Sequence, residues 1–124
     1  MVILKHPLLT HKYTTVLMET DFSYNAPHRF IVVPTPTLDD PTQKHATLAN
    51  IHFQEGPIKE CGVNGVCNED LIGMVICRLN YFQESSFVCD ENAEAIMHLE
   101  AALQALRKRT LAREARNVEG THEV

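Results

Sequence analysis

The chain has 124 residues, 44% of them hydrophobic, which fits one globular domain with a modest core and excludes a disordered protein. Its formal net charge of −5 argues against a general nucleic-acid coat, because binding to a polymer normally requires a wide basic surface. No apolar run is long enough for a membrane span, and Lys5, His6 and Pro7 interrupt residues 1–9, so we expect a soluble, cytosolic protein without a signal peptide.

The first half of the chain predicts a small antiparallel β-core. Lys12–Leu17 has the β-branched content of an edge strand, although residues 1–17 are hard to assign, and Met18 is an alternative start that would make them an upstream extension. Arg29–Val33, between two prolines, predicts a short strand, and the alternation in Thr47–Gln54 predicts a half-buried strand antiparallel to it. The proline-rich, polar stretch Thr35–His45 predicts a loop.

Two further features precede the helical half. Lys59–Asn68 (KECGVNGVCN) predicts a tight loop, because Gly62 and Gly65 around Asn64 permit backbone with positive φ. Such a loop can offer backbone amides to a ligand, but it more often only makes a turn. The four cysteines lack the close pairs of a zinc site, so we interpret them as reduced thiols and predict no bound metal.

Two amphipathic helices are predicted next. Asn68 is expected to cap the first helix, which ends before Glu84, and Asp90 or Asn92 is expected to cap the second. The second helix has an apolar seam that must be buried, made of Ile96, Leu99, Leu103 and Leu106. Because the connection between the helices is short, they should fold back as an antiparallel hairpin. The predicted class is α+β, with 1–17 an unassigned extension, 18–67 the β-core and 68–124 the hairpin and tail of a single folding unit.

The end of the second helix is strongly basic. Five of the eleven basic residues lie close together there: Arg107, Lys108, Arg109, Arg113 and Arg116. They indicate either a solvated helix terminus, favoured by the macrodipole, or an anion site, since the planar arginine fork matches phosphate oxygens. Asn117 can adopt the left-handed conformation that closes a helix, after which residues 118–122 either fold back towards the arginines or fray.

The sequence lacks the motifs of common enzymes, including GxSxG, the P-loop and GxGxxG, so we predict no catalytic residue and no cofactor. Phe82, Asn92 and the arginines instead fit a small nucleotide, with its base on Phe82, its ribose or base edge at Asn92 and its phosphates on the arginines. In a hairpin the arginines lie roughly 20 Å or more from Phe82 and Asn92, so a second subunit would have to supply them. The alternatives are a core role for Phe82 and a capping role for Asn92.

Two runs of sequence resemble the phage Thoeris anti-defence sponge family, namely ANIHFQEGPIKECGVNGVCNEDLIGMVICRL and ENAEAIMHLEAALQALRKRTLAREARNVEGTH. The resemblance covers Phe22–His122 and leaves residues 1–17 outside. The hairpin is also similar to that of the phage anti-CBASS sponges. The resemblance implies a non-enzymatic protein that sequesters cyclic ADP-ribose isomers made by bacterial TIR-domain immune enzymes, and it implies dimers that build into hexamers in the host bacterial cytoplasm.

The resemblance also implies site residues. The ligand-binding candidates come from the hairpin and the tail: Phe82, Asn92, Arg107, Arg109, Arg113, Arg116, Thr121 and His122. Lys59 and Asn64 are candidates for a second pocket that would hold cyclic oligonucleotides of the CBASS type. Asn117 stands where related sequences carry glycine, which affects how the tail folds. Two other functions stay open: a phosphodiesterase-like enzyme that degrades such signals, and a small nucleic-acid-binding or partner-binding module. The favoured reading implies neither a nucleic-acid polymer nor a membrane as partner.

Overall fold

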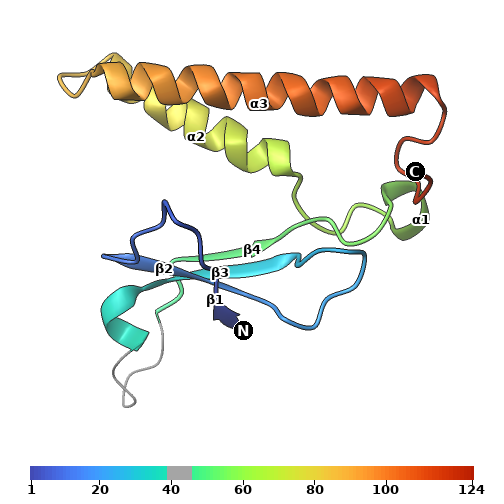
Figure 1. The fold of residues 1–124 in the computed structure, drawn as a ribbon, viewed down its shortest axis with the longest axis horizontal. Helices are drawn as coiled ribbons and strands as arrows, with labels where there is room; N and C mark the ends of the chain where they lie inside the picture. Colours follow the sequence, from blue (N-terminus) through green and yellow to red (C-terminus); the bar gives the residue numbers. More distant parts are fainter. Residues whose placement is uncertain (39–45) are drawn as a thin grey trace. The chain divides into compact units, whose positions relative to one another are not determined.

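A four-stranded antiparallel sheet is followed by helices in the computed structural model, which describes residues 1–38 and 46–124 (Figure 1). The predicted α+β class is therefore confirmed. The chain forms two compact units: Met1–Gly56 with Cys61–Gly65, and Pro57–Glu60 with Val66–Val124. The sheet belongs to the first unit, and the two long helices belong to the second.

The sheet is a simple meander in the order β1-β2-β3-β4. Its strands are β1 (Val2–Ile3), β2 (Thr14–Met18), β3 (Arg29–Pro34) and β4 (Ala49–His52). Each strand pairs antiparallel with the next. The predicted strand at Arg29–Val33 and its antiparallel partner are thus confirmed, although β4 is shorter than the alternating stretch from which it was predicted.

The prediction of an edge strand at Lys12–Leu17 is wrong. The strand exists as β2, but it lies inside the sheet because β1 pairs with its outer side, Val2 opposite Met18. The sheet therefore draws on residues that precede the predicted β-core. The predicted loop at Thr35–His45 begins instead with a 3-10 helix, η1 (Thr35–Leu38), and its remainder, residues 39–45, lies outside the described residues.

The core of the sheet unit is small and partly polar. Leu17 and Val33 are buried, and they are joined by Thr15, which is 1% exposed and pairs directly with Val33 across β2 and β3. A buried hydroxyl needs a partner. The Oγ1 atoms of Thr15 and Thr35 lie 2.8 Å apart, and the Thr35 hydroxyl donates to the His11 carbonyl oxygen at 2.8 Å. This chain of hydrogen bonds ties the start of η1 to β2.

Replacing Thr35 with valine should lower the free energy of unfolding by about 1–3 kcal/mol, because it leaves the Thr15 hydroxyl and the His11 carbonyl unpaired. Urea unfolding followed by circular dichroism measures the loss. The double variant Thr15→Val/Thr35→Val removes both hydroxyls and should recover much of it. A double variant that is less stable than Thr35→Val would contradict this account of the pair.

The connection from β4 to the helices is closed by side-chain amides. Gln54 donates to the carbonyl oxygens of Gly56 and Gly62, while Asn64 bonds both the backbone N–H and the carbonyl of Glu55. The predicted tight loop is therefore present, with Gly62 at φ +73°. It is not wholly irregular, because a short helix, α1 (Ile58–Cys61), lies within it.

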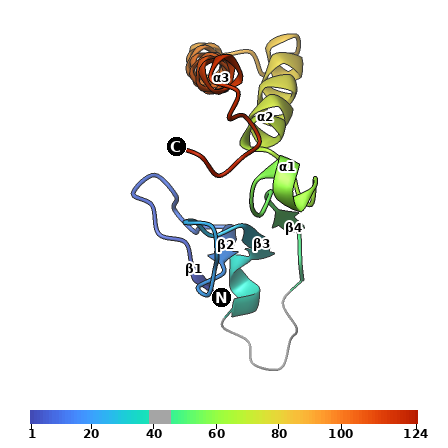
Figure 2. The ribbon, with the colours of Figure 1, turned by 90° about the vertical axis from the view of Figure 1, so that its right-hand side faces the viewer.

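Helices α2 (Asn68–Gln83) and α3 (Asp90–Ala115) pack against each other as the predicted antiparallel hairpin (Figures 1 and 2). The predicted caps are wrong. The N-cap residues are Cys67 and Cys89, and Asn68 and Asp90 are already helical. At the start of α2 the Cys67 backbone N–H donates to the Asp70 carboxylate at 2.8 Å. Asp70, the third residue of the helix, thus provides an acceptor for an N–H group that has none within the helix.

The apolar seam of α3 was predicted to be buried, but the structure shows it only partly buried. Its residues Ile96, Leu99, Leu103 and Leu106 are intermediate in exposure, and no side chain of α2 or α3 is fully buried. A Cβ atom built on Gly73 would meet no neighbour within 4 Å in the described part of the chain. Two helices alone cannot enclose both apolar faces, so this hairpin leaves apolar surface uncovered.

All four cysteines are free, as predicted. Partial burial raises the pKa of the Cys67 thiol, and the nearby carboxylates of Asp70 and Glu69 raise it further. A thiol with a raised pKa stays protonated and is a poor nucleophile. Within residues 1–38 and 46–124, none of the helices combines the length and the apolar character that crossing a bilayer requires.

Candidate ligand-binding site

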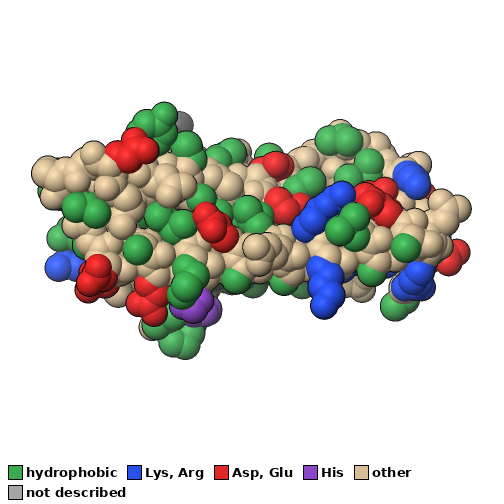
Figure 3. All heavy atoms as spheres, turned by 90° about the horizontal axis from the view of Figure 1, so that it is seen from above, with side chains coloured by type: hydrophobic (Ala, Val, Ile, Leu, Met, Phe, Trp, Pro, Cys, Tyr) green, Lys and Arg blue, Asp and Glu red, His purple; other side chains and the backbone are tan. Residues whose placement is uncertain are grey.

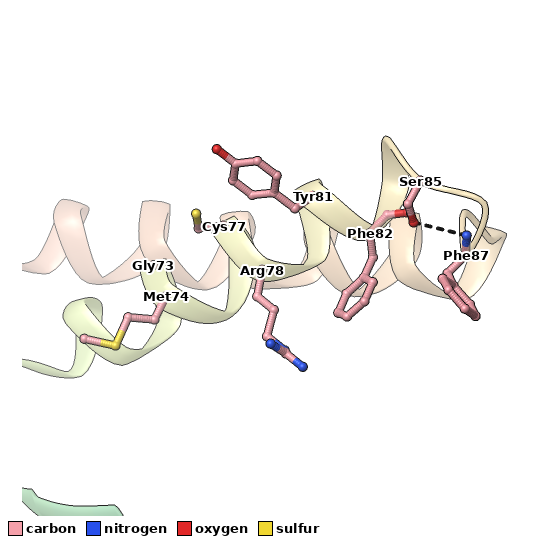
Figure 4. A pocket seen from close by; sticks show the side chains of 8 residues that line it. All are labelled: Gly73, Met74, Cys77, Arg78, Tyr81, Phe82, Ser85 and Phe87. Atoms are coloured by element: carbon pink, nitrogen blue, oxygen red, sulfur yellow. Dashed lines mark hydrogen bonds between the residues drawn. The ribbon is translucent and has the colours of Figure 1, made fainter.

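A hollow of about 840 Å³ runs along the exposed face of α2 and the turn that follows it (Figure 4). Its lining is mostly apolar and consists of Gly73, Met74, Cys77, Arg78, Tyr81, Phe82, Ser85 and Phe87. Arg78 and Phe82 project to the same side of α2, with the guanidinium carbon 5.0 Å from the ring centroid. A flat aromatic face next to a cation suits a planar, electron-rich ligand group.

Phe82 is 36% exposed, so its ring is not enclosed in a core within this chain. Sequence reasoning selected Phe82 but missed its neighbours Arg78, Tyr81 and Phe87. The spacing of four residues between Arg78 and Phe82 was a usable signal, since residues i and i+4 meet on a helix. Phe87 had no such signal, because it lies in the turn between the helices.

Asn92 lies in the first turn of α3 and is half-buried. The Gln83 side chain joins the two helix ends: its amide donates to the Cys89 carbonyl at 3.0 Å and its oxygen accepts the Cys89 N–H at 3.1 Å. Phe82 and Asn92 are therefore held at the same end of the hairpin. The N-cap residue is Cys89, so the capping role that was the alternative for Asn92 is not the one that the structure shows.

The opposite end of α3 carries the cations, and Figure 3 shows Lys and Arg side chains gathered over its C-terminal half. The four arginines differ in their surroundings. Arg107 forms an ion pair with Glu114 at 3.5 Å, and Arg116 donates to the Val124 carbonyl oxygen at 2.9 Å. Arg109 is exposed and forms no hydrogen bond or ion pair with the described residues. Arg113 is half-buried against the tail.

The C-terminal tail folds back towards α1 and does not fray. Asn117 has φ +58°, the left-handed conformation predicted for it, and Gly120 at φ +74° makes the second turn. Arg113 Nη2 then lies within hydrogen-bonding distance of the carbonyl oxygens of Val118, Thr121 and Glu123. Of the two predicted courses for the tail, the structure shows the one that returns to the arginines.

The tail brings several candidate residues together. The Thr121 hydroxyl donates to the Val118 carbonyl at 2.6 Å, and His122 Nδ1 lies 2.6 Å from a Glu60 carboxylate oxygen. The backbone N–H of Lys59 donates to the Gly120 carbonyl at 2.9 Å. Lys59, predicted for a second pocket, thus lies beside the tail. Asn64 belongs to the other compact unit, where its side chain closes the loop.

One chain therefore carries two separate groups of candidate residues. Phe82 and Asn92 lie at one end of the hairpin, and the arginines lie with Thr121 and His122 at the far end of α3. From Asn92 to Arg109 the helix rises by about 25 Å, at 1.5 Å per residue. A ligand the size of a dinucleotide cannot reach both groups in the same chain.

Residues 45–111 match the model of the Acb2/Tad1 hairpin domain. The chain is also 50% identical to the protein named Thoeris anti-defense 1 of Bacillus phage SBSphiJ7, over an alignment of 138 positions that covers 97% of each protein. The chain belongs to the Acb2/Tad1 family. This confirms the predicted resemblance, but its predicted limits are wrong, since 97% coverage leaves only about four of the 124 residues unmatched and so includes most of residues 1–17.

Proposed function

We propose that the protein is a phage anti-defence sponge that binds cyclic ADP-ribose isomers of TIR-based Thoeris immunity and does not degrade them. Membership of the Acb2/Tad1 family and the relative named Thoeris anti-defense 1 support an anti-defence role. The single observation that supports the choice of ligand is the pair of complementary residue groups on the hairpin. One end has an exposed aromatic with an amide, and the other has further arginines beside a guanidinium that has no partner among residues 1–38 and 46–124.

The proposed contacts follow from the chemistry of the ligand. Its adenine stacks on Phe82 beside the Arg78 guanidinium, and a stacked base contributes about 1–3 kcal/mol. Asn92 hydrogen-bonds a base or ribose edge. The two phosphates bind the arginine end, where each charge-assisted hydrogen bond adds about 1.5–3 kcal/mol. Together these contacts can exceed the roughly 8 kcal/mol needed to outcompete an effector that responds to micromolar signal.

The proposed site requires a homo-oligomer. The two residue groups lie about 25 Å apart along α3, so the aromatic end of one chain must meet the arginine end of another. The uncovered apolar surface of α2 and of the turn after it, including Met74 and Phe87, supplies an area that a neighbouring chain can bury. Following the resemblance to the sponge family, we propose that the assembly consists of dimers that build into hexamers. Sedimentation velocity should show a single species larger than a monomer, and a monomer at working concentration would contradict the shared site.

A second pocket for cyclic oligonucleotides of the CBASS type is also proposed. Of its two candidates, Lys59 is the stronger, because its ammonium group has no partner within the part of the chain that the structure describes. The Asn64 amide is already engaged on both of its polar atoms by Glu55. Lys59→Ala should therefore weaken oligonucleotide binding directly. Asn64→Ala should weaken this binding less, and only because the loop that Asn64 closes unfolds locally.

Ligand retention tests the function directly. The protein is incubated with a mixture of cyclic nucleotides that includes cyclic ADP-ribose isomers, filtered, washed and heated, and the released molecules are identified by mass spectrometry. A sponge releases the intact cyclic ADP-ribose isomer at about one molecule per proposed site. A linear product identifies a phosphodiesterase instead. Failure to retain any cyclic nucleotide, with steeply salt-dependent binding to a polynucleotide, identifies a nucleic-acid-binding module.

A further inference from the structure

The four arginines at the end of α3 look alike in sequence but not in structure. We propose that Arg113 is a positioning residue, whose guanidinium holds the C-terminal tail so that Thr121 and His122 lie beside the nucleotide site, while Arg109 supplies the guanidinium that meets phosphate. This inference rests on the proposed function and assigns different roles within its cationic end.

The engagement of Arg113 is the first step. Its Nη2 atom lies 3.0 Å from the Val118 carbonyl oxygen, 3.1 Å from that of Thr121 and 2.6 Å from that of Glu123. An NH2 group has two protons, so these three acceptors exhaust it. Hydrogen bonds from a charged donor are roughly twice as strong as neutral ones, and the half-buried location of Arg113 limits competition from water.

Arg109 provides the contrast. It lies one turn earlier on the same helix, is exposed, and has no hydrogen bond or ion pair to any residue in 1–38 or 46–124. A guanidinium without protein partners can turn both arms of its fork towards phosphate oxygens at no cost in broken bonds. Moving Arg113 to a phosphate through Nη2 would instead release three backbone carbonyls.

A second anchor fixes the other side of the tail. The Gly120 carbonyl accepts the Lys59 N–H at 2.9 Å, and His122 Nδ1 pairs with Glu60 at 2.6 Å. The tail is therefore held between α1 and the end of α3, and the His122 ring remains 74% exposed. Without the Arg113 side chain, the Val118, Thr121 and Glu123 carbonyl oxygens would lose this donor. The tail would keep its α1 contacts, the hydrogen bonds of its own turn and the Arg116 bond to Val124.

Exchange and affinity measurements on the full chain test this inference. Arg113→Ala should speed hydrogen exchange of the Lys59 amide at least about tenfold, since its acceptor is the Gly120 carbonyl oxygen of the docked tail. Arg109→Ala removes the same charge from the same helix and should leave this exchange unchanged.

A double-mutant cycle links the tail to binding, with a purified cyclic ADP-ribose isomer titrated calorimetrically. His122→Ala should weaken binding several-fold in the wild-type background and have no further effect in the Arg113→Ala background. Multiplicative losses, or weak binding by Arg113→Ala with unchanged amide exchange, would overturn the inference in favour of direct phosphate contact. If the wild type binds no nucleotide, the proposed function fails, and the role of Arg113 in ligand binding fails with it. The exchange measurement still tests the anchoring itself: faster exchange in Arg113→Ala shows that Arg113 holds the tail, and unchanged exchange shows that it does not.

Discussion

Arg109→Ala should weaken binding of a cyclic ADP-ribose isomer by about 10- to 100-fold, the largest loss among the arginine variants. Each hydrogen bond between a charged donor and a charged acceptor contributes about 1.5–3 kcal/mol, and 1.4 kcal/mol corresponds to a factor of ten. Arg109 has no partner among the residues that the structure describes, so its removal disturbs no internal contact. The loss should therefore appear as affinity in titration calorimetry, with the unfolding midpoint unchanged.

Lys108→Ala is the matched control. It removes one positive charge from the same exposed part of α3, and Lys108 is not a proposed ligand contact. At physiological salt an isolated surface charge is strongly screened, so this variant should bind within about twofold of the wild type. Both variants must sediment like the wild type. Equal losses for the two variants would mean that binding depends on net charge and not on a guanidinium at position 109.

Local patterns explain which elements could be predicted. The helical periodicity of residues 68–83 and 90–115 and the apolar run at Arg29–Val33 each specify an element without reference to the rest of the chain. The position of β2 inside the sheet could not be predicted this way. It depends on β1, a strand of two residues whose signal is its pairing with Leu17 and Met18, which lie 14 and 16 residues further along the chain than their partners Ile3 and Val2.

In the candidate site, too, the features set by local sequence could be predicted, and those set by distant contacts could not. The shared end of Phe82 and Asn92 follows from hairpin connectivity, which is local information. The occupation of Arg113 by the tail depends on two left-handed residues, Asn117 and Gly120, and on a distant anchor at Lys59. A sequence pattern can indicate that the tail turns, but it cannot indicate which carbonyl oxygens come within hydrogen-bonding distance of which arginine.

The half-buried seam of α3 illustrates a third limit. Periodicity predicted correctly that one face of the helix is apolar, but burial depends on what covers that face. Within the hairpin that cover is α2, whose outer face stays exposed at Met74 and Tyr81, as does Phe87 in the turn that follows. This incomplete cover is what the proposed assembly would complete, so stability and ligand binding should both depend on protein concentration.

Gly65 is required for a close approach of two backbone segments and not for an unusual φ. Its φ is not in the left-handed region, unlike that of Gly56 and Gly62. A Cβ atom at position 65 would lie 2.5 Å from the His52 carbonyl oxygen and equally close to the Phe53 carbonyl group. Both belong to the backbone at the end of β4, which cannot turn aside as a flexible side chain can.

Gly65→Ala should accordingly lower the free energy of unfolding by about 3 kcal/mol, the upper range for overpacking, because either β4 or the loop closed by Asn64 must shift. Gly62→Ala is the control within the same loop. A Cβ atom at this position would meet no described residue within 4 Å, but φ is +73°, so the cost is only that of the left-handed conformation, about 1 kcal/mol. Urea unfolding at one fixed protein concentration compares the two. If Gly65→Ala unfolds at the same urea concentration as Gly62→Ala, the contact with β4 does not restrict this position and the loop is free to move away from the sheet.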